Sequence, residues 1–556
     1  MRLAQIKPHE HEIPGQIKSR YISQLLMALS SAIIVPLSQA NEIWWYGNPA
    51  LGLIAYVPLY IATISSKSLR ESAGLGALFG AVSTILSYFW LANFGEFSLW
   101  TIGGVTVVYT TYNGVLNTVL GLVLKTFLKQ RPLIFGIFWT GYELVKSIGF
   151  LGFPWGLAAY PFSDFLPLVQ IADITGVYGI SFIVLYLNAF IAEVLMLCFR
   201  NRVHPTPITY KILVLHLVFI TGLLTIYIIY GYNRLAYNAE ITNELDVLMV
   251  QQNSDAWVAD NQNETLSLLQ RLTQENTAQN NPDLVVWSES SLRNPYQDTW
   301  VTYYDTNPTG YPFNSFLSDI DVPLLTGAPY TKNNKSYNST ILFDRKGNPV
   351  DHYSKQQLVP FAERVPFWNL QIVRDFYKDV LGLVAIWSPG DRQTVFQVEG
   401  KNGPVRFATP ICFEDSFSGI TQIFSKQNVD LFINLTNDAW SKTNSAQLQH
   451  FISSKFRTIE TRTTMIRSTN AGVTGVIDPW GKTLVTLPMF TAQALRTTVP
   501  IYNWRNSPTI YTQIGNSFGW LLVGIALILL AFSLLPQHLC RGFYKRITDR
   551  HNMATP

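Results

Sequence analysis

Two hydrophobic patterns divide the chain. The first is a series of long apolar runs, and a run of about 20 mostly apolar residues is long enough for one helix to cross a bilayer. These runs are residues 22–38, 49–65, 72–92, 103–124, 132–150, 168–198, 209–231 and 514–535. The run at 132–150 is the weakest, because Glu143 and Lys146 interrupt it. The pattern predicts a membrane α-helical bundle of about eight transmembrane helices, with a seven-helix region at 21–232 and a last helix at 514–535.

The second pattern covers residues 240–505, where short runs rich in β-branched residues alternate with amphipathic segments. Strands are expected at 245–250, 284–287, 324–328, 340–343, 405–411, 431–435 and 473–477. Helices are expected at 263–275 and from about 445 to 468. Such alternation is typical of a layered domain that contains both helices and sheets.

Polar side chains follow three of the expected strands directly. Glu289 comes soon after the run at 284–287, Cys412 ends the run at 405–411, and Asn437 and Asp438 follow the run at 431–435. Ligands in α/β sheets usually bind where strands end. The pattern therefore predicts a site at these strand ends.

The distribution of charge supports the division into two parts. Residues 21–232 contain only 7 acidic and 9 basic side chains, whereas the whole chain has 36 acidic and 40 basic ones. A helical core buried in a soluble protein is the alternative, but such a core rarely comes with ordered loop charges. The net charge of +4 is too small to indicate a nucleic-acid partner.

Basic residues in the short loops indicate the orientation, because cytoplasmic loops carry an excess of Lys and Arg. Alternate loops contain Lys67, Arg70, Lys125, Lys129, Arg131, Arg200, Arg202 and Lys211. The loops around 93–100 and 152–167 contain neither Lys nor Arg. We therefore expect residues 1–20 and 536–556 to be cytoplasmic tails and residues 240–505 to lie outside the cytoplasm. The first apolar run has no convincing cleavage site, so it is interpreted as a retained helix.

The chain has three cysteines, Cys198, Cys412 and Cys540. An odd number without clustered spacing excludes a disulfide framework and a cysteine-based zinc site. In the expected topology Cys412 is the one thiol outside the cytoplasm. It is either a functional thiol or a small buried core residue, and its position alone leaves both readings open.

A cysteine nucleophile needs a base and a donor that stabilises the oxyanion. The region 240–505 has two histidines, His352 and His450, and neither belongs to a recognisable partner motif. Glu289 is an alternative base, and Lys355 could supply a compact positive charge. Taken singly, each could equally be a solvated surface residue.

Together, several segments resemble one family. They are Pro282–Glu289, Tyr353–Pro366, Ile411–Glu414, Asn434–Trp440, Gln449–His450 with Arg462, Arg467–Thr474, Gly152–Trp155 and Gly176–Gly179. In this order they are similar to the nitrilase superfamily, specifically to its membrane branch, the apolipoprotein N-acyltransferases. The resemblance covers nearly the whole chain and implies that residues 240–505 form a nitrilase-like α-β-β-α sandwich.

The resemblance also implies a catalytic triad of Glu289, Lys355 and Cys412. Glu289 would act as the general base and then as the acid, and Lys355 would stabilise the oxyanion. Glu363 would orient Lys355 or the substrate, and Glu414 would support the site.

Other candidates have weaker support. Trp257, Asn338 and Trp440 match family positions that line the site, although each could be a packing residue. Glu143 is an ionisable group in an apolar run, which often marks function in membranes, but it could simply pair with Lys146. Trp155 could line a lipid gate or belong to an interfacial aromatic belt.

The activity implied by the resemblance is N-acylation of the N-terminal diacylglyceryl-cysteine of a lipoprotein. The donor would be a phospholipid, the reaction would be ping-pong through a thioester on Cys412, and no cofactor or metal would be needed. We expect a monomer in the bacterial inner membrane with its catalytic domain on the periplasmic side. The alternatives are a membrane-bound nitrilase-type amidase with water as acceptor, and a homologue that only binds a partner.

Overall fold

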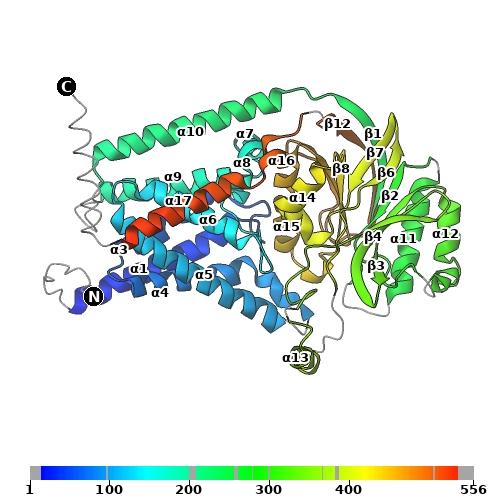
Figure 1. The fold of residues 1–556 in the computed structure, drawn as a ribbon, viewed down its shortest axis with the longest axis horizontal. Coiled ribbons are helices and arrows are strands. Elements are labelled where there is room, and N and C mark those ends of the chain that lie inside the picture. Colours follow the sequence, from blue (N-terminus) through cyan, green and yellow to red (C-terminus); the bar gives the residue numbers. More distant parts are fainter. Residues whose placement is uncertain are drawn as a thin grey trace.

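The computed structural model describes residues 14–95, 98–199, 208–255, 261–278, 280–297, 301–365, 367–381, 387–504 and 507–535. A helical bundle and a layered α/β domain lie next to each other along the long axis of the molecule (Figure 1). The chain enters the α/β domain from α10 and returns to the bundle through α17 (Figure 1).

The bundle consists of the helices that precede the first strand, together with the last helix. Their bounds are α1 Pro14–Ser38, α2 Pro49–Gly52, α3 Val57–Ser65, α4 Leu69–Ser87, α5 Ser98–Thr126, α6 Arg131–Lys146, α7 Leu166–Val169, α8 Ala172–Thr175, α9 Val177–Cys198, α10 Tyr210–Ala236 and α17 Ser517–Leu534. Within the described residues, five helices are long and apolar enough to cross a membrane: α1 from Ser19, α5, α9, α10 and α17. Each of the five overlaps one of the predicted apolar runs.

Two of the predicted spans are broken in the structure. Residues 49–65 form α2 and α3 instead of one helix, and Pro58 lies in the first turn of α3, the position in a helix that suits proline best. Residues 168–198 are interrupted at Gly176, which has a φ of +65° between α8 and α9. A Cβ atom there would lie 2.8 Å from the ring of Tyr511, so both the backbone and the packing favour glycine.

The α/β domain contains two six-stranded sheets. The first has the order β12-β1-β2-β3-β4-β5 and the second has the order β11-β10-β9-β8-β7-β6. The strands are β1 Ile241–Gln251, β2 Leu284–Trp287, β3 Leu324–Lys332, β4 Lys335–Phe343, β5 Pro349–Ser354, β6 Phe396–Gly400, β7 Gly403–Ala408, β8 Leu431–Thr436, β9 Thr464–Thr469, β10 Gly475–Ile477, β11 Thr483–Thr486 and β12 Gln493–Tyr502. The central strands β2 and β8 are buried along their whole length and pair in parallel with their neighbours, which explains their continuous apolar sequences.

The two sheets pack face to face, with helices on their outer faces. Val247 and Val286 of the first sheet share a buried core with Phe407 and Ile433 of the second. The helices are α11 Gln262–Thr277, α12 Phe313–Ile320, α13 Gln371–Leu381, α14 Ser418–Ser425, α15 Asn444–Thr461 and α16 Ile510–Ile514. The helices α11 and α12 cover the first sheet, and α14 and α15 lie between the second sheet and the bundle (Figure 1). This arrangement confirms the predicted fold class of a helical bundle plus an α-β-β-α sandwich.

The helix predicted from about 445 to 468 is too long. The structure ends α15 at Thr461 and begins β9 at Thr464. Arg462 adopts a left-handed conformation with a φ of +53°, which terminates the helix. The following segment is rich in threonine and β-branched residues, which favour a strand.

The helix α15 belongs to both halves of the molecule. Its side chains from Ser445 to Thr461 are all buried. Phe451, Phe456 and Ile459 pack in the same hydrophobic cluster as Phe135 of α6. The helix α15 of the α/β domain therefore packs into the core of the bundle.

A buried carboxylate also joins the two halves. Asp173 of α8 accepts from Arg462, at the end of α15, with 2.8 Å between Nη2 and Oδ2. The same Oδ2 atom lies 2.8 Å from Nη2 of Arg234 of α10. Asp173 and Arg462 are each only 1% exposed, so each charge depends on its partner.

We expect Asp173→Ala to destabilise the whole protein. Removing one partner of a buried ion pair typically costs about 3–5 kcal/mol, because the other charge stays buried without compensation. Thermal unfolding of the purified protein in detergent should show a fall in Tm of several degrees. Glu275→Ala, which removes an exposed ion pair with Arg271, is the matched control and should leave Tm unchanged. An equal Tm for both variants would contradict the role assigned to Asp173.

Candidate active site

The predicted triad residues meet between the ends of the two sheets. Glu289 follows β2 and Lys355 follows β5, both in the first sheet, whereas Cys412 follows β7 of the second sheet. Glu289 is 5% exposed and Lys355 is 1% exposed, while Cys412 is partly exposed. The site therefore combines two buried charges with a partly exposed cysteine residue.

Lys355 lies between two carboxylates. Its Nζ atom is 2.9 Å from Oε1 of Glu363 and 3.5 Å from Oε1 of Glu289. Burial lowers the pKa of Lys355, but the negative charges of Glu363, of Cys412 when it is ionised and of Glu289 outweigh it and hold this pKa well above its usual range. Lys355 is therefore an ammonium at neutral pH.

Both oxygens of Glu289 accept hydrogen bonds. The Nδ2 atom of Asn338 donates to Oε1 over 2.7 Å, and the backbone N–H of Asn437 donates to Oε2 over 2.8 Å. Asn338 also lies 3.3 Å from Oε1 of Glu363, so it touches both carboxylates that face Lys355. These contacts fix the orientation of the Glu289 carboxylate.

Cys412 has an unusual backbone conformation. Its φ is +52°, in the left-handed region that residues other than glycine rarely adopt. Asn434 holds the turn, because its Nδ2 atom donates to the carbonyl oxygens of Pro410 and Cys412 over 3.0 and 2.9 Å. Such strained residues cluster at active sites. The conformation therefore marks Cys412 independently of any sequence motif.

The thiol of Cys412 is the resting form. Burial raises the pKa of Cys412, the charge of Glu289 raises it further, and the charge of Lys355 opposes these effects only in part. A thiol with a raised pKa needs a neighbouring base to react. Glu289, whose charge acts on this thiol, is the candidate for that base.

Glu414 connects the segments that carry Lys355 and Cys412. Its Oε1 atom accepts from the backbone N–H groups of Gln356 and Gln357 over 2.7 and 2.9 Å. Its Oε2 atom accepts from the N–H of Ile411 over 2.8 Å. Burial raises the pKa of Glu414 to about 7, against the effect of these donors. Glu414 thus braces the residues on either side of the site and does not itself reach the thiol.

Two of the predicted tryptophans lie where the bundle meets the site. Trp155 donates from Nε1 to Oγ of Ser416 over 2.8 Å, and its ring is 6.5 Å from that of Phe413. The ring of Trp440 is 5.6 Å from that of Trp90, which precedes α5. Both belong to one aromatic cluster that also contacts Cys412. Trp257 lies outside the described residues.

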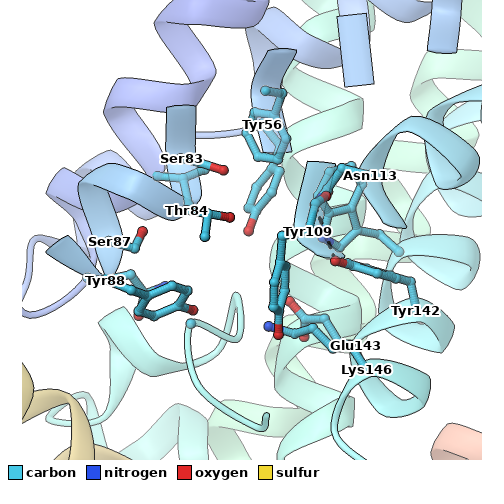
Figure 2. A pocket seen from close by; sticks show the side chains of 15 residues that line it. Tyr56, Ser83, Thr84, Ser87, Tyr88, Tyr109, Asn113, Tyr142, Glu143 and Lys146 are labelled. Atoms are coloured by element: carbon cyan, nitrogen blue, oxygen red, sulfur yellow. Dashed lines mark hydrogen bonds between the residues drawn. The ribbon is translucent and has the colours of Figure 1, made fainter. Parts of the chain in front are cut away.

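Glu143 is separate from the triad. It lines a polar cavity inside the bundle, together with Lys146 and several tyrosines (Figure 2). The cavity volume of about 50 Å³ suits roughly four water molecules. Glu143 accepts from the N–H of Ala158 over 2.8 Å, and Lys146 donates to the carbonyl of Trp155 over 2.7 Å. The two side chains therefore anchor the loop that carries Trp155.

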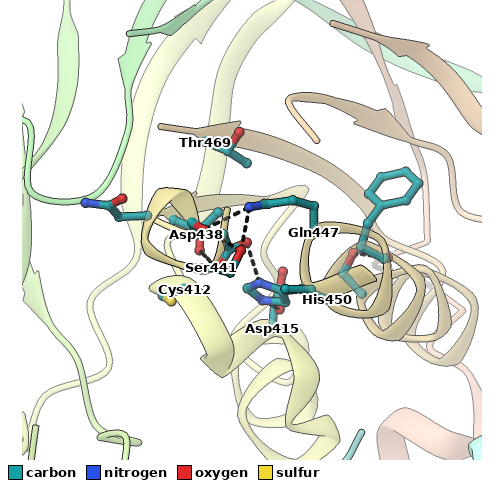
Figure 3. A network of polar contacts seen from close by, with 12 residues as sticks. Cys412, Asp415, Asp438, Ser441, Gln447, His450 and Thr469 are labelled. Atoms are coloured by element: carbon teal, nitrogen blue, oxygen red, sulfur yellow. Dashed lines mark hydrogen bonds and ion pairs between the residues drawn. The ribbon is translucent and has the colours of Figure 1, made fainter. Parts of the chain in front are cut away.

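A buried polar network lies beside Cys412 (Figure 3), and its contacts were not predicted from the sequence. His450 of α15, which had no recognisable partner motif, contacts Asp415 through one ring nitrogen and Asp438 through the other. Arg467 of β9 pairs with Asp415. Asp438 was noticed as a strand-end residue, but its partner on α15 could not be inferred. Among the described residues, no cluster of His, Cys, Asp and Glu could hold a metal ion.

Comparison with known proteins identifies both halves of the chain. Residues 31–190 match the family profile described as "Apolipoprotein N-acyltransferase N-terminal domain", and residues 247–507 match "Carbon-nitrogen hydrolase". Nit3 from Saccharomyces cerevisiae, a member of branch 10 of the nitrilase superfamily, aligns with a TM-score of 0.33 and 18% identity. That alignment covers 47% of this chain and 93% of Nit3.

Two similar relatives match along nearly their whole length. "Apolipoprotein N-acyltransferase 2" from Treponema denticola is 35% identical over 516 residues, which is 92% of this chain and 97% of the relative. "Apolipoprotein N-acyltransferase 2" from Treponema pallidum is 36% identical over 537 residues, which is 91% of this chain and 94% of the relative. The protein is therefore a membrane acyltransferase of the carbon-nitrogen hydrolase superfamily, and it belongs to the apolipoprotein N-acyltransferase family.

Proposed function

We propose that the protein transfers an acyl chain from a membrane phospholipid to the N-terminal amine of a diacylglyceryl-cysteine on a lipoprotein. The observation that carries this proposal is the meeting of Glu289, Lys355 and Cys412 beneath an aromatic cluster shared with the helical bundle. The names of the relatives supply the lipoprotein acceptor. The apolar helices supply a reason for a lipid donor, since neither lipid readily leaves the bilayer.

The first half-reaction forms a thioester. Glu289 takes the proton from Cys412, and the thiolate attacks the carbonyl carbon of a phospholipid ester. The ammonium of Lys355 stabilises the oxyanion of the tetrahedral intermediate. When the C–O bond breaks, Glu289 gives the proton to the departing oxygen, which leaves as a lysophospholipid.

The second half-reaction uses the same groups. The amine of the lipoprotein attacks the thioester carbon, Glu289 accepts a proton from the attacking nitrogen, and Lys355 again stabilises the oxyanion. The C–S bond breaks, and Glu289 returns the proton to the sulfur of Cys412. The products are an amide and the resting thiol, so the mechanism is ping-pong.

Surface features favour a site that faces a membrane. In the sequence, the helix α13 comes after Glu363 and before β6. Its Ile372 is 77% exposed. Phe376 of the same helix contacts Trp100 near the start of α5, with 6.4 Å between the ring centres. Amphipathic helices of this kind lie at membrane surfaces. Together with the loop charges, this placement supports a catalytic domain on the periplasmic side.

The thioester can be tested by acyl transfer from a labelled phospholipid to the purified protein. We expect label on the wild-type protein and none on Cys412→Ala. In Glu289→Gln, labelling should slow by roughly 10²–10⁴-fold, the usual contribution of a general base. Cys198→Ala, which removes an exposed cysteine at the end of α9, is the control and should label normally.

Addition of a diacylated lipopeptide should then move the label from the protein to the amine of the lipopeptide. Release of free fatty acid alone would identify a membrane-bound hydrolase. Absence of label on every variant would indicate a protein that only binds its partner. Either outcome would contradict the proposed transfer.

The charge of Lys355 should control the thiol. Because this ammonium lowers the pKa of Cys412, Lys355→Met should raise the midpoint of Cys412 alkylation against pH, by about one unit or more. The measurement uses a background without Cys198 and Cys540, followed by mass spectrometry of the alkylated peptide. Lys401→Met, which removes an exposed cation of the same domain, should leave the midpoint unchanged. A midpoint that falls or stays constant in Lys355→Met would remove Lys355 from the mechanism.

A further inference from the structure

We propose that His450 is a positively charged positioning residue that holds the segment after Cys412 and the loop that binds Glu289 in one arrangement. The inference rests on the proposed role of Cys412 as the nucleophile. The resemblance to the family included the segment Gln449–His450, but it assigned His450 no role in the site.

His450 is fully buried between two carboxylates. Its Nε2 atom is 2.7 Å from Oδ1 of Asp415, and its Nδ1 atom is 2.8 Å from Oδ2 of Asp438. His450 and Asp415 have no exposed surface, and Asp438 is 6% exposed. In Figure 3 the imidazole lies between the two acids, with the sulfur of Cys412 nearby.

The hydrogen bonds determine the charge of the ring. An ionised carboxylate only accepts hydrogen bonds, so a ring that faces two carboxylates must donate from both nitrogens. Asp415 also pairs with Arg467, which keeps this carboxylate ionised. With Asp438 ionised as well, His450 is an imidazolium, and its charge and that of Arg467 balance those of Asp415 and Asp438.

The network connects two segments that shape the site. Asp415 lies three positions after Cys412 in the short helix Cys412–Ser416. Asp438 follows Asn437, whose N–H binds Glu289. By contacting both acids from α15, His450 fixes the nucleophile turn relative to the loop that orients the base.

A residue of the bundle also contacts the imidazolium. The ring of Trp155 lies 5.4 Å from that of His450, with 37° between the planes. Aromatic rings attract cations at such distances. The ring therefore adds a favourable contact on a face that the aspartates do not cover.

The charge balance matters for the thiol. The charge of Asp438 raises the pKa of Cys412. In the native network the imidazolium offsets that charge. Without it, two buried carboxylates beside the thiol would share the single charge of Arg467, and the thiolate would become harder to form.

The test measures the pH midpoint of Cys412 alkylation in the full-length protein without Cys198 and Cys540. His450→Gln should raise the midpoint by about one pH unit and slow acyl-enzyme formation at neutral pH by at least about tenfold. His352→Gln is the matched control, because His352 is partly exposed and stacks on Tyr330 away from this network. It should change neither quantity.

A second variant separates the effect of the charge of His450 from the effect of its shape. Adding Asp438→Asn to His450→Gln removes the uncompensated carboxylate, so the midpoint should return towards the wild-type value. The proposal would be overturned by an unchanged midpoint in His450→Gln. It would also be overturned if the midpoint of the double variant were raised as much as that of the single variant. If His450→Gln does not fold, the double variant carries the test. A folded double variant with a nearly native midpoint supports the charge balance, and an unfolded one overturns it.

Failure of the proposed function would give a different result from failure of the proposal for His450. Alkylation reports on the thiol without any lipid, whereas acyl labelling reports on its use. If Cys412→Ala still accepted label from a phospholipid, the thioester would be wrong. The midpoints of the His450 variants would still show whether the network controls the thiol.

Discussion

The buried ammonium of Lys355, held between Glu289 and Glu363, is the interaction on which the proposed chemistry depends. A buried ammonium without partners would cost several kcal/mol, and the two carboxylates offset this cost. The proton that Glu289 takes from Cys412 moves within the same small space. The net charge of the cluster is therefore constant through the reaction, and no new charge has to be created in a buried environment. Lys355 can then stabilise the oxyanion as the negative charge moves from the sulfur to the substrate.

This arrangement needs a rigid frame, which Glu414 supplies. Its carboxylate binds backbone N–H groups directly after Lys355 and directly before Cys412. The two residues come from different sheets, so their relative position would otherwise depend on loop conformation. Fixed groups of this kind need no reorganisation when the oxyanion forms, which is a large part of how enzymes lower barriers.

The sequence predicted those features that arise from local patterns or ordered motifs. Long apolar runs indicated the bundle, and short runs that end in polar residues indicated where the site lies. The breaks at Pro58 and Gly176 were missed, because hydrophobicity alone continues across them. The partners of His450 could not be inferred, since Asp415 lies 35 positions away and only the packing of α15 brings them together. Hydrophobic periodicity describes each element, whereas such contacts depend on how the elements pack.

The shared core around α15 has a consequence for how lipids reach the thiol. A catalytic domain joined to its helices by a linker could tilt or descend towards a substrate. Here Phe451, Phe456 and Ile459 of α15 are packed into the bundle itself. The distance between the thiol and the apolar helices is therefore fixed. In the proposed reaction, the lipids must therefore bring the ester and the amine to the sulfur, because the domain that carries the sulfur cannot tilt towards them as a whole.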